Sequence, residues 1–264
     1  MTQLQEVSAS AGPEPTAALP DDLIRPAAEI VDPAALRTRL LAAVEEAGSD
    51  QMERRKAAVA VLRAAQSDGR APIAEAFRAS PFSASPTTRA YAWLTDQLVA
   101  ATFELSRSVF HPAHTPTEQE RLCLIAVGGY GRGEMAPQSD VDLLFLAPYK
   151  LTPWAENVIE SMLYILWDLK MKVGHASRTV KDCIRLARDD FTIRTSLVER
   201  RYLAGDANLA DTLSDKLQSD LFADTVAEFI EAKLEERDER HRKQGGQRYM
   251  VEPNVKEGKG GLRD

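Results

Sequence analysis

The sequence has few cysteines, no long apolar run and no excess of positive charge. Among its 264 residues only Cys123 and Cys183 are cysteines, which excludes a disulfide framework and predicts a reducing, cytoplasmic location. No segment reaches the ~18 apolar residues of a membrane span, and the polar start of the chain lacks the features of a secretory signal. Lysine and arginine number 33 against 40 aspartate and glutamate, a balance atypical of nucleic-acid-binding proteins. We therefore expect a soluble protein with neither a membrane nor a nucleic acid as partner.

Apolar residues, by contrast, make up 44% of the sequence and suffice for a sizeable core. Residues 1–26 are rich in alanine, serine, proline and acidic groups without apolar periodicity, which predicts a disordered lead-in. Residues 27–117 are predicted to form a helical region that closes in a polar loop at 111–117. Apolar residues recur at helical spacing after an N-cap at Asp32 and again at 87–109, which predicts a helix in each place. The stretch 51–66 between them is rich in helix-favouring residues and is also predicted to be helical.

The pattern changes in residues 118–206, where short continuous apolar runs predict buried strands. These strands are expected at 122–127, 141–146 and 171–179. A strongly amphipathic helix is predicted between the second and third of them, at 154–169, with Trp154 and Trp167 in the core.

Residues 207–264 are predicted to be a helical segment followed by a truncated glycine-rich linker. The last helices are expected at 181–189, 207–220 and 222–242, and the mixed charges of 235–243 predict a solvated helical face. The fold class predicted is α+β, with a helical N-terminal region, a small mixed β-sheet core flanked by helices, and a helical C-terminal part.

One window, Val127 to Leu146, carries residues suited to phosphate chemistry. The first strand ends at Gly128-Gly129, where a backbone without side chains can turn sharply and bring its N–H groups against a phosphate. Asp140 and Asp142 open the next strand, and residues two apart on a strand project to the same side. Such a carboxylate pair suits Mg²⁺, which is commonly shared with substrate phosphates. The combination predicts a site for a nucleoside triphosphate.

Other interpretations of the window are weaker. A P-loop requires Lys and Ser or Thr after its last glycine, whereas Gly133 is followed by Glu134 and Met135. A dinucleotide fingerprint starting at Gly129 would need glycine at 134. A simple turn with Asp140 as a cap remains an alternative, although Asp142 lies inside an apolar strand where an unpaired carboxylate is costly.

The motifs resemble the bifunctional PII uridylyltransferase and uridylyl-removing enzymes of the DNA polymerase β-like nucleotidyltransferase superfamily. The resemblance rests on Gly128-Gly-Tyr-Gly-Arg-Gly-Glu134, Ser139-Asp-Val-Asp-Leu-Leu144, residues 166–179, residues 199–206 and residues 252–264. It identifies 118–206 as the nucleotidyltransferase core. It implies transfer of UMP from UTP to a tyrosine of the PII signalling protein, with release of pyrophosphate. The uridylyl-removing hydrolase domain and glutamine as an effector would belong only to a longer chain.

The same resemblance implies roles for particular residues. Asp140 and Asp142 would be catalytic and would hold Mg²⁺, while Gly128, Gly129, Arg132 and Ser139 would contact the nucleotide. Two alternatives of function stay open. One is an adenylyl- or other nucleotidyltransferase of the same fold with a different acceptor, and the other is an inactive nucleotide-binding regulatory domain.

Several side chains also have purely structural interpretations. Arg132 can pair with Glu134 at the surface, Ser139 can cap a turn, and His175 can be a packing residue. Lys256, Lys259 and Arg263 fit a solvated linker, and neither cysteine has a setting typical of a nucleophile.

The predicted third strand contains no acid, although many relatives in the superfamily carry a third carboxylate there. The nearest acids are Asp168, expected to pair with Lys170 or Lys172, and Glu199, expected to pair with Arg200 or Arg201. We therefore predict a site of two carboxylates, with His175 or Ser177 lying where a third acid would otherwise be.

Overall fold

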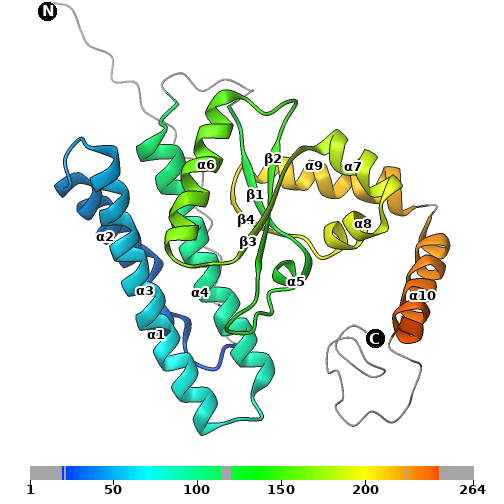
Figure 1. The fold of residues 1–264 in the computed structure, drawn as a ribbon, viewed down its shortest axis with the longest axis horizontal. Helices are drawn as coiled ribbons and strands as arrows, with labels where there is room; N and C mark the ends of the chain where they lie inside the picture. The colour runs from blue at the N-terminus through cyan, green and yellow to red at the C-terminus, as the bar shows by residue number, and fades with distance from the viewer. Residues whose placement is uncertain (1–19, 21, 114–119, 224, 244–264) are drawn as a thin grey trace, which may run out of the picture.

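The computed structural model describes residues 20, 22–113, 120–223 and 225–243 (Figure 1). Most of the predicted lead-in and the segment containing Lys256, Lys259 and Arg263 lie outside these residues. None of the helices in this described part combines the length and the hydrophobicity that a membrane span requires.

A small mixed sheet of four strands forms the centre, in the order β3-β2-β1-β4. Strand β1 (Cys123–Ala126) pairs antiparallel with β2 (Val141–Ala147) and with β4 (Arg201–Gly205), while β3 (Val173–Thr179) runs parallel to β2. The α+β class and the three predicted strands are confirmed. Strand β4 was not predicted, because it is an edge strand in which only Ala204 is buried and the apolar signal is weak.

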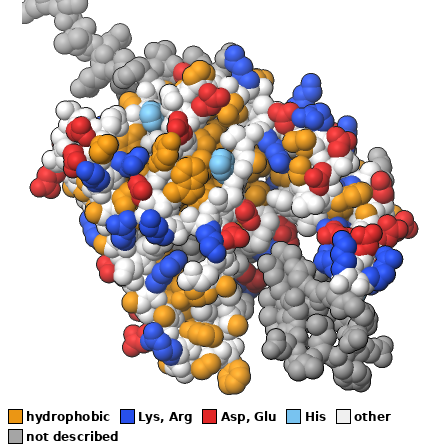
Figure 2. Space-filling view, viewed as in Figure 1, with side chains coloured by type: hydrophobic (Ala, Val, Ile, Leu, Met, Phe, Trp, Pro, Cys, Tyr) orange, Lys and Arg blue, Asp and Glu red, His pale blue; other side chains and the backbone are white. Residues whose placement is uncertain are grey.

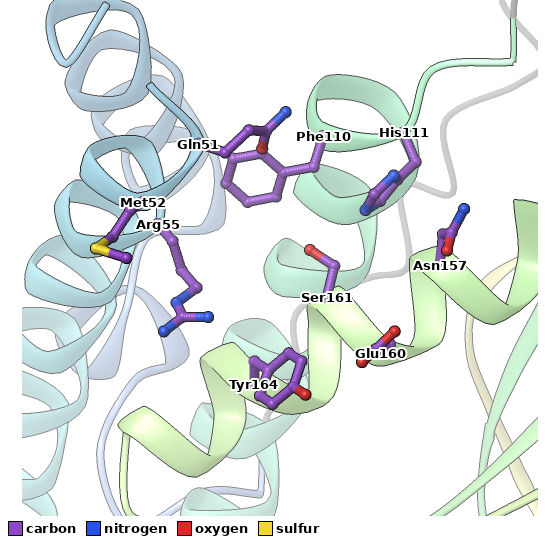
Figure 3. Close-up of a pocket in the computed structure, with 9 residues that line it drawn as sticks. All are labelled: Gln51, Met52, Arg55, Phe110, His111, Asn157, Glu160, Ser161 and Tyr164. Atoms are coloured by element: carbon purple, nitrogen blue, oxygen red, sulfur yellow. The ribbon is translucent and has the colours of Figure 1, made fainter. Parts of the chain in front are cut away.

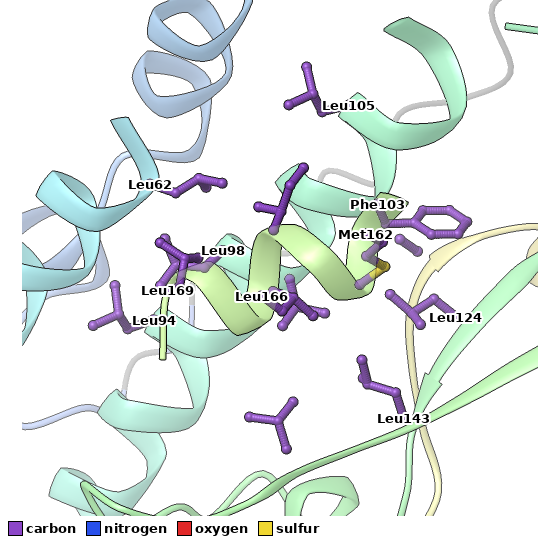
Figure 4. Close-up of a cluster of buried hydrophobic side chains, with 14 of the residues drawn as sticks. Leu62, Leu94, Leu98, Phe103, Leu105, Leu124, Leu143, Met162, Leu166 and Leu169 are labelled. Atoms are coloured by element: carbon purple, nitrogen blue, oxygen red, sulfur yellow. The ribbon is translucent and has the colours of Figure 1, made fainter. Parts of the chain in front are cut away.

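Helices cover both faces of this sheet (Figure 1). On one face lie α4 (Ala84–Leu105), its π-helical extension η1 (Ser106–Phe110) and α6 (Pro153–Asp168). Their apolar side chains pack with Leu124 and Leu143 of the sheet, and the same cluster reaches Leu62 in the N-terminal helices (Figure 4). Trp154 packs against this core as predicted, but Trp167 is 45% exposed, because it lies on the solvent side of α6.

The N-terminal helices form a further layer against α4 (Figure 1). They are α1 (Ala27–Ile30), α2 (Pro33–Glu46) and α3 (Gln51–Ala79). The predicted cap is present, since Asp32 accepts hydrogen bonds from the backbone N–H groups of Ala34 and Ala35. Helix α3 continues through Pro72, beyond the predicted stretch, because the buried side chains that follow hold it against α4.

The opposite face of the sheet is covered by α7 (Val180–Asp189), α8 (Phe191–Val198) and α9 (Ala207–Leu217). The short helix α8 was not predicted. The π-helical turn η2 (Gln218–Phe222) and α10 (Val226–Lys243) follow, and α10 contains no buried residue, in agreement with the solvated face predicted there. On the face shown in Figure 2, charged side chains of both signs are interspersed.

Candidate active site

The two predicted metal ligands lie at the start of β2. Val141 between them is buried in the core, so Asp142 projects from the opposite face, half-buried, while Asp140 is exposed. Among the described residues, neither carboxylate accepts a hydrogen bond or forms an ion pair. Burial and, secondarily, the nearby charge of Asp140 raise the pKa of Asp142. An uncompensated acidic pair of this kind suits a cation.

The glycine turn lies directly against Asp142. The single-turn helix α5 (Gly128–Gly131) follows β1, and Gly128 adopts a φ of +58° that glycine accommodates without strain. A Cβ built on Gly128 would lie 3.6 Å from Oδ2 of Asp142. The glycine turn that is predicted to bind phosphate and the predicted metal ligand Asp142 are therefore neighbours in space.

A second glycine, Gly174, leaves space for the Asp142 carboxylate from the neighbouring strand. The register of β2 and β3 pairs Asp142 with Gly174, and a Cβ at position 174 would lie only 2.5 Å from Oδ1 of Asp142. The position on β3 where an acid could stand beside Asp142 thus has no room for a side chain.

This register corrects one prediction. His175 pairs with Leu143 and Ser177 with Phe145, so both lie on the face opposite to Asp142, where His175 meets the Phe145 ring edge-on. The expectation that either residue lines the site is wrong, because one step along a strand changes the face. Besides Gly174, the residues of β3 on the acid face are Ala176 and Arg178.

Gly174→Ala is expected to lower the rate of the reaction at this site by about 10- to 100-fold with little loss of stability. The added methyl group must displace the carboxylate oxygen, and misplacement of a reacting group by ~1 Å can cost about 10²-fold in rate. His175→Ala, one residue away on the opposite face, is the matched control and should keep near-parental activity. Steady-state rates and melting temperatures of the two variants check this. Equal rates for Gly174→Ala and the parent would show that Asp142 needs no such clearance.

Arg132 pairs with an acid that is distant in the sequence. Its Nη1 lies 2.8 Å from Oε1 of Glu199, not beside the predicted partner Glu134, and Glu199 in turn contacts neither Arg200 nor Arg201 through its carboxylate. Ser139 accepts a hydrogen bond from the backbone N–H of Ala136 at 2.9 Å, which is the predicted turn-capping contact. Its own hydroxyl proton remains a donor.

A buried network, missed by sequence reasoning, anchors the glycine turn to the scaffold. The side chain of Tyr130, in the middle of the turn, is 1% exposed, and its hydroxyl donates to Asp96 of α4 at 2.6 Å. Burial and the charge of Asp96 raise the pKa of Tyr130 well above its usual value, so the hydroxyl keeps its proton. Arg201 of β4 forms a bidentate pair with Asp96, at 2.6 and 3.1 Å, and also donates to the carbonyl of Tyr130 at 3.2 Å.

The only sequence signal for this network is a bulky aromatic residue inside a glycine-rich turn. Its partners, Asp96 and Arg201, are 105 residues apart.

Cavities lie on both sides of the sheet. The larger, about 380 Å³, is lined by α3, η1 and α6, with His111, Glu160 and Tyr164 among its residues (Figure 3). Because α6 covers the face opposite to Asp142, this cavity is remote from the acids. Asp168, at the end of α6, pairs with Arg55 at 3.4 Å rather than with Lys170 or Lys172.

The smaller cavity, about 210 Å³, lies on the acid face. Val127, Leu144 and Ala176 form its sheet side, and these residues directly precede Gly128 or follow Asp142 and Gly174 on the same face. Arg178 and residues of α8 complete it. We assign the chemistry to this side of the sheet because the carboxylates are there, although the cavity is the smaller one.

Among the described residues, the acid face offers Asp140 and Asp142 as the candidate metal ligands. Within the described part of the chain, no group of three or more His, Cys, Asp or Glu side chains could hold a metal ion. Mg²⁺ fits such a pair, because it takes oxygen ligands and commonly completes its shell with water and substrate phosphates. The cysteines offer no alternative chemistry, since burial raises the pKa of both thiols to about 12.

A mixed sheet with a glycine turn after one strand and paired aspartates on the next is the arrangement that the resemblance to nucleotidyltransferases implies. A family model described as glutamate-ammonia ligase adenylyltransferase matches residues 6–172, more than half of the chain, and the chain belongs to the nucleotidyltransferase family that it describes. A second model, described as GlnD PII-uridylyltransferase, matches residues 228–264.

Individual relatives carry a more specific description than the family model does. The chain is 64% identical to a bifunctional uridylyltransferase/uridylyl-removing enzyme of Ruegeria pomeroyi, over 88% of the chain and 25% of that protein. Proteins of the same description from Cereibacter sphaeroides and Caulobacter vibrioides are 58% and 52% identical, over 92% and 89% of the chain and 26% and 25% of their own lengths. All three relatives are described as bifunctional uridylyltransferase/uridylyl-removing enzymes, and the chain spans about a quarter of their length.

Proposed function

We propose that the chain transfers UMP from UTP to a tyrosine hydroxyl of the PII signalling protein in a Mg²⁺-dependent reaction that releases pyrophosphate. The observation that carries the proposal is the uncompensated pair Asp140 and Asp142 beside the glycine turn, with Gly174 leaving space for the carboxylate. The names of the relatives supply the nucleotide, and the family description matched by residues 228–264 supplies PII. The free, buried cysteines suit a cytoplasmic reaction.

Different residues of the chain have different roles in the proposed transfer. Asp140 and Asp142 would hold Mg²⁺, which when bound would neutralise charge on the triphosphate. The backbone N–H groups at Gly128 and Gly129, together with Arg132, bind phosphate oxygens of the nucleotide. The tyrosine oxygen of the acceptor then bonds to the α-phosphorus as the bond to the bridging oxygen breaks. Pyrophosphate leaves with that electron pair, and the phenolic proton passes to solvent.

The mechanism requires no third carboxylate on the enzyme. A tyrosine hydroxyl has an ordinary pKa near ~10, so it loses its proton far more readily than an aliphatic alcohol does. This agrees with the space beside Asp142, where Gly174 leaves no room for an acidic side chain.

Adenylyl transfer to a different protein is the second candidate. The family match over residues 6–172 favours it, because that model describes an adenylyltransferase of glutamate-ammonia ligase. A regulatory domain without activity is the weaker alternative, since the two repelling carboxylates would be kept without a cation to bind.

The deciding experiment offers the chain each of the four nucleoside triphosphates, labelled at the α-phosphorus, with Mg²⁺ and either PII or glutamate-ammonia ligase. We expect label on PII only, from UTP only, and on tyrosine. The Asp168→Asn variant is the control, because that acid lies across the sheet and should leave the rate within about threefold. Label from ATP on the ligase would favour the second candidate, and no transfer at all would favour the regulatory domain.

A further inference from the structure

Glu199 approaches the glycine turn from a distant part of the chain. It follows α8, and a Cβ on Gly131 would lie 1.5 Å from the backbone carbonyl oxygen of Glu199. Only glycine at position 131 allows this contact, so the backbone of residue 199 packs directly on the turn. The side chain of Glu199 then extends to Arg132, with 2.8 Å between Oε1 and Nη1.

The two terminal nitrogens of the Arg132 guanidinium face different parts of the site. Nη1 is taken by Glu199, whereas Nη2 lies 3.6 Å from the position that a Cβ of Gly129 would occupy. The second nitrogen is therefore beside the phosphate cradle while the first is held. A planar guanidinium with five N–H donors can keep a carboxylate on one edge and bind an anion with another.

We infer that Glu199 is a positioning residue that holds Arg132 in place for the phosphate groups of the incoming nucleotide. The inference rests on the proposed function, because it needs a triphosphate in the cradle. The side chain of Arg132 is 52% exposed, and without a partner it would sample many rotamers. Ordering such a side chain in advance is worth about 2- to 10-fold in affinity.

Glu199 does not act as the missing third carboxylate. Its carboxylate is engaged by Arg132, and within the described residues it does not join Asp140 and Asp142 in a group able to hold a metal. A role through Arg132 and a role in the chemical step predict different kinetics, so the two can be separated.

The test is a double-mutant cycle on the full chain with Arg132→Ala, Glu199→Ala and the double variant. UTP affinity is measured by equilibrium dialysis in EDTA, and KM and kcat are measured with Mg²⁺. We expect Glu199→Ala to weaken UTP binding and raise KM by about 3- to 10-fold, with kcat within about twofold. Adding Glu199→Ala to Arg132→Ala should change nothing further, because the interaction is already lost.

Two further variants sharpen the reading. Glu199→Gln should fall between the parent and Glu199→Ala, since an amide oxygen still accepts a hydrogen bond from Nη1. Glu104→Ala removes a comparable surface pair with Arg107, at 2.9 Å, and should leave all constants unchanged. Melting temperatures confirm that the variants are folded.

Three results would overturn the inference. The first is tighter UTP binding by Glu199→Ala, the outcome of simply removing a negative charge near phosphates. The second is an equal effect of Glu199→Ala with and without Arg132. The third is a loss of kcat as large as that of Asp140→Asn, which would make Glu199 a catalytic residue. If the parent chain binds no UTP, the proposed function fails together with this inference. If the parent binds UTP but the cycle shows no coupling between Arg132 and Glu199, only this inference fails.

Discussion

Asp142→Asn is expected to lower nucleotidyl transfer by at least about 10³-fold while leaving the fold intact. The substitution keeps the size of the side chain and removes one of the two charges proposed to hold Mg²⁺, and metal ligands commonly supply several kcal/mol of transition-state stabilisation. Asp140→Asn should behave in the same way. Transfer within about threefold of the parent in either variant would refute the assignment of the pair.

Asp142→Asn should be at least as stable as the parent when no metal is present. Burial and Asp140 raise the pKa of Asp142 in the folded state, so the folded protein binds this proton more tightly than the unfolded chain does. The contribution of this group to the free energy of unfolding is therefore favourable at low pH and is lost as pH rises through the raised pKa. Asp142→Asn has no such titration, so the variant does not lose this stability as the pH rises.

Thermal melts at pH 7 and pH 5 check this, with EDTA in one series and with Mg²⁺ in place of EDTA in the other. The parent should gain stability from Mg²⁺ by mass action, and Asp142→Asn should not. A melting temperature for Asp142→Asn well below that of the parent in EDTA would show that the carboxylate has a stabilising partner.

Asp96→Ala is expected to have the largest effect on stability, about 3–5 kcal/mol. It leaves the guanidinium of Arg201 without its carboxylate and the hydroxyl of Tyr130 without its acceptor, in a place where both are largely buried. For a chain of this length that loss lowers the melting temperature by roughly 10 °C.

Activity should fall together with stability, because this network fixes the backbone of the glycine turn. Denaturant unfolding measures the effect, with Glu53→Ala as the control, since Glu53 forms an exposed pair with Lys56. A loss below about 1 kcal/mol for Asp96→Ala would mean that the turn is held by its packing alone.

The parts of the site that sequence predicts are those carried by local patterns. The apolar run before Gly128 and the interrupted run around Asp142 mark two strands, and strand geometry then places Asp142 beside the turn, with Asp140 near it. Nothing in those patterns fixes how the third strand aligns. His175 was therefore expected on the wrong face, and the contact of Gly174 with Asp142 became visible only in the β2–β3 register.

Pairs between distant segments were the other source of error. Arg132 has an acid two positions away in Glu134, yet the folded chain brings it to Glu199. Arg201 likewise follows Glu199 closely in sequence but pairs with Asp96 on α4. Local charge patterns cannot distinguish such partners, because the choice depends on how the helices pack on the sheet.

The most direct test of the acid-face site is paramagnetic NMR with Mn²⁺ in place of Mg²⁺ and UTP as the nucleotide. Mn²⁺ takes the same oxygen ligands, and it broadens the amide signals of residues close to it. The account predicts the strongest broadening at Gly128, Gly129, Asp142 and Gly174, and its loss in Asp142→Asn. Broadening centred instead on the larger cavity, around Tyr164, would place the nucleotide on the other side of the sheet and contradict the account.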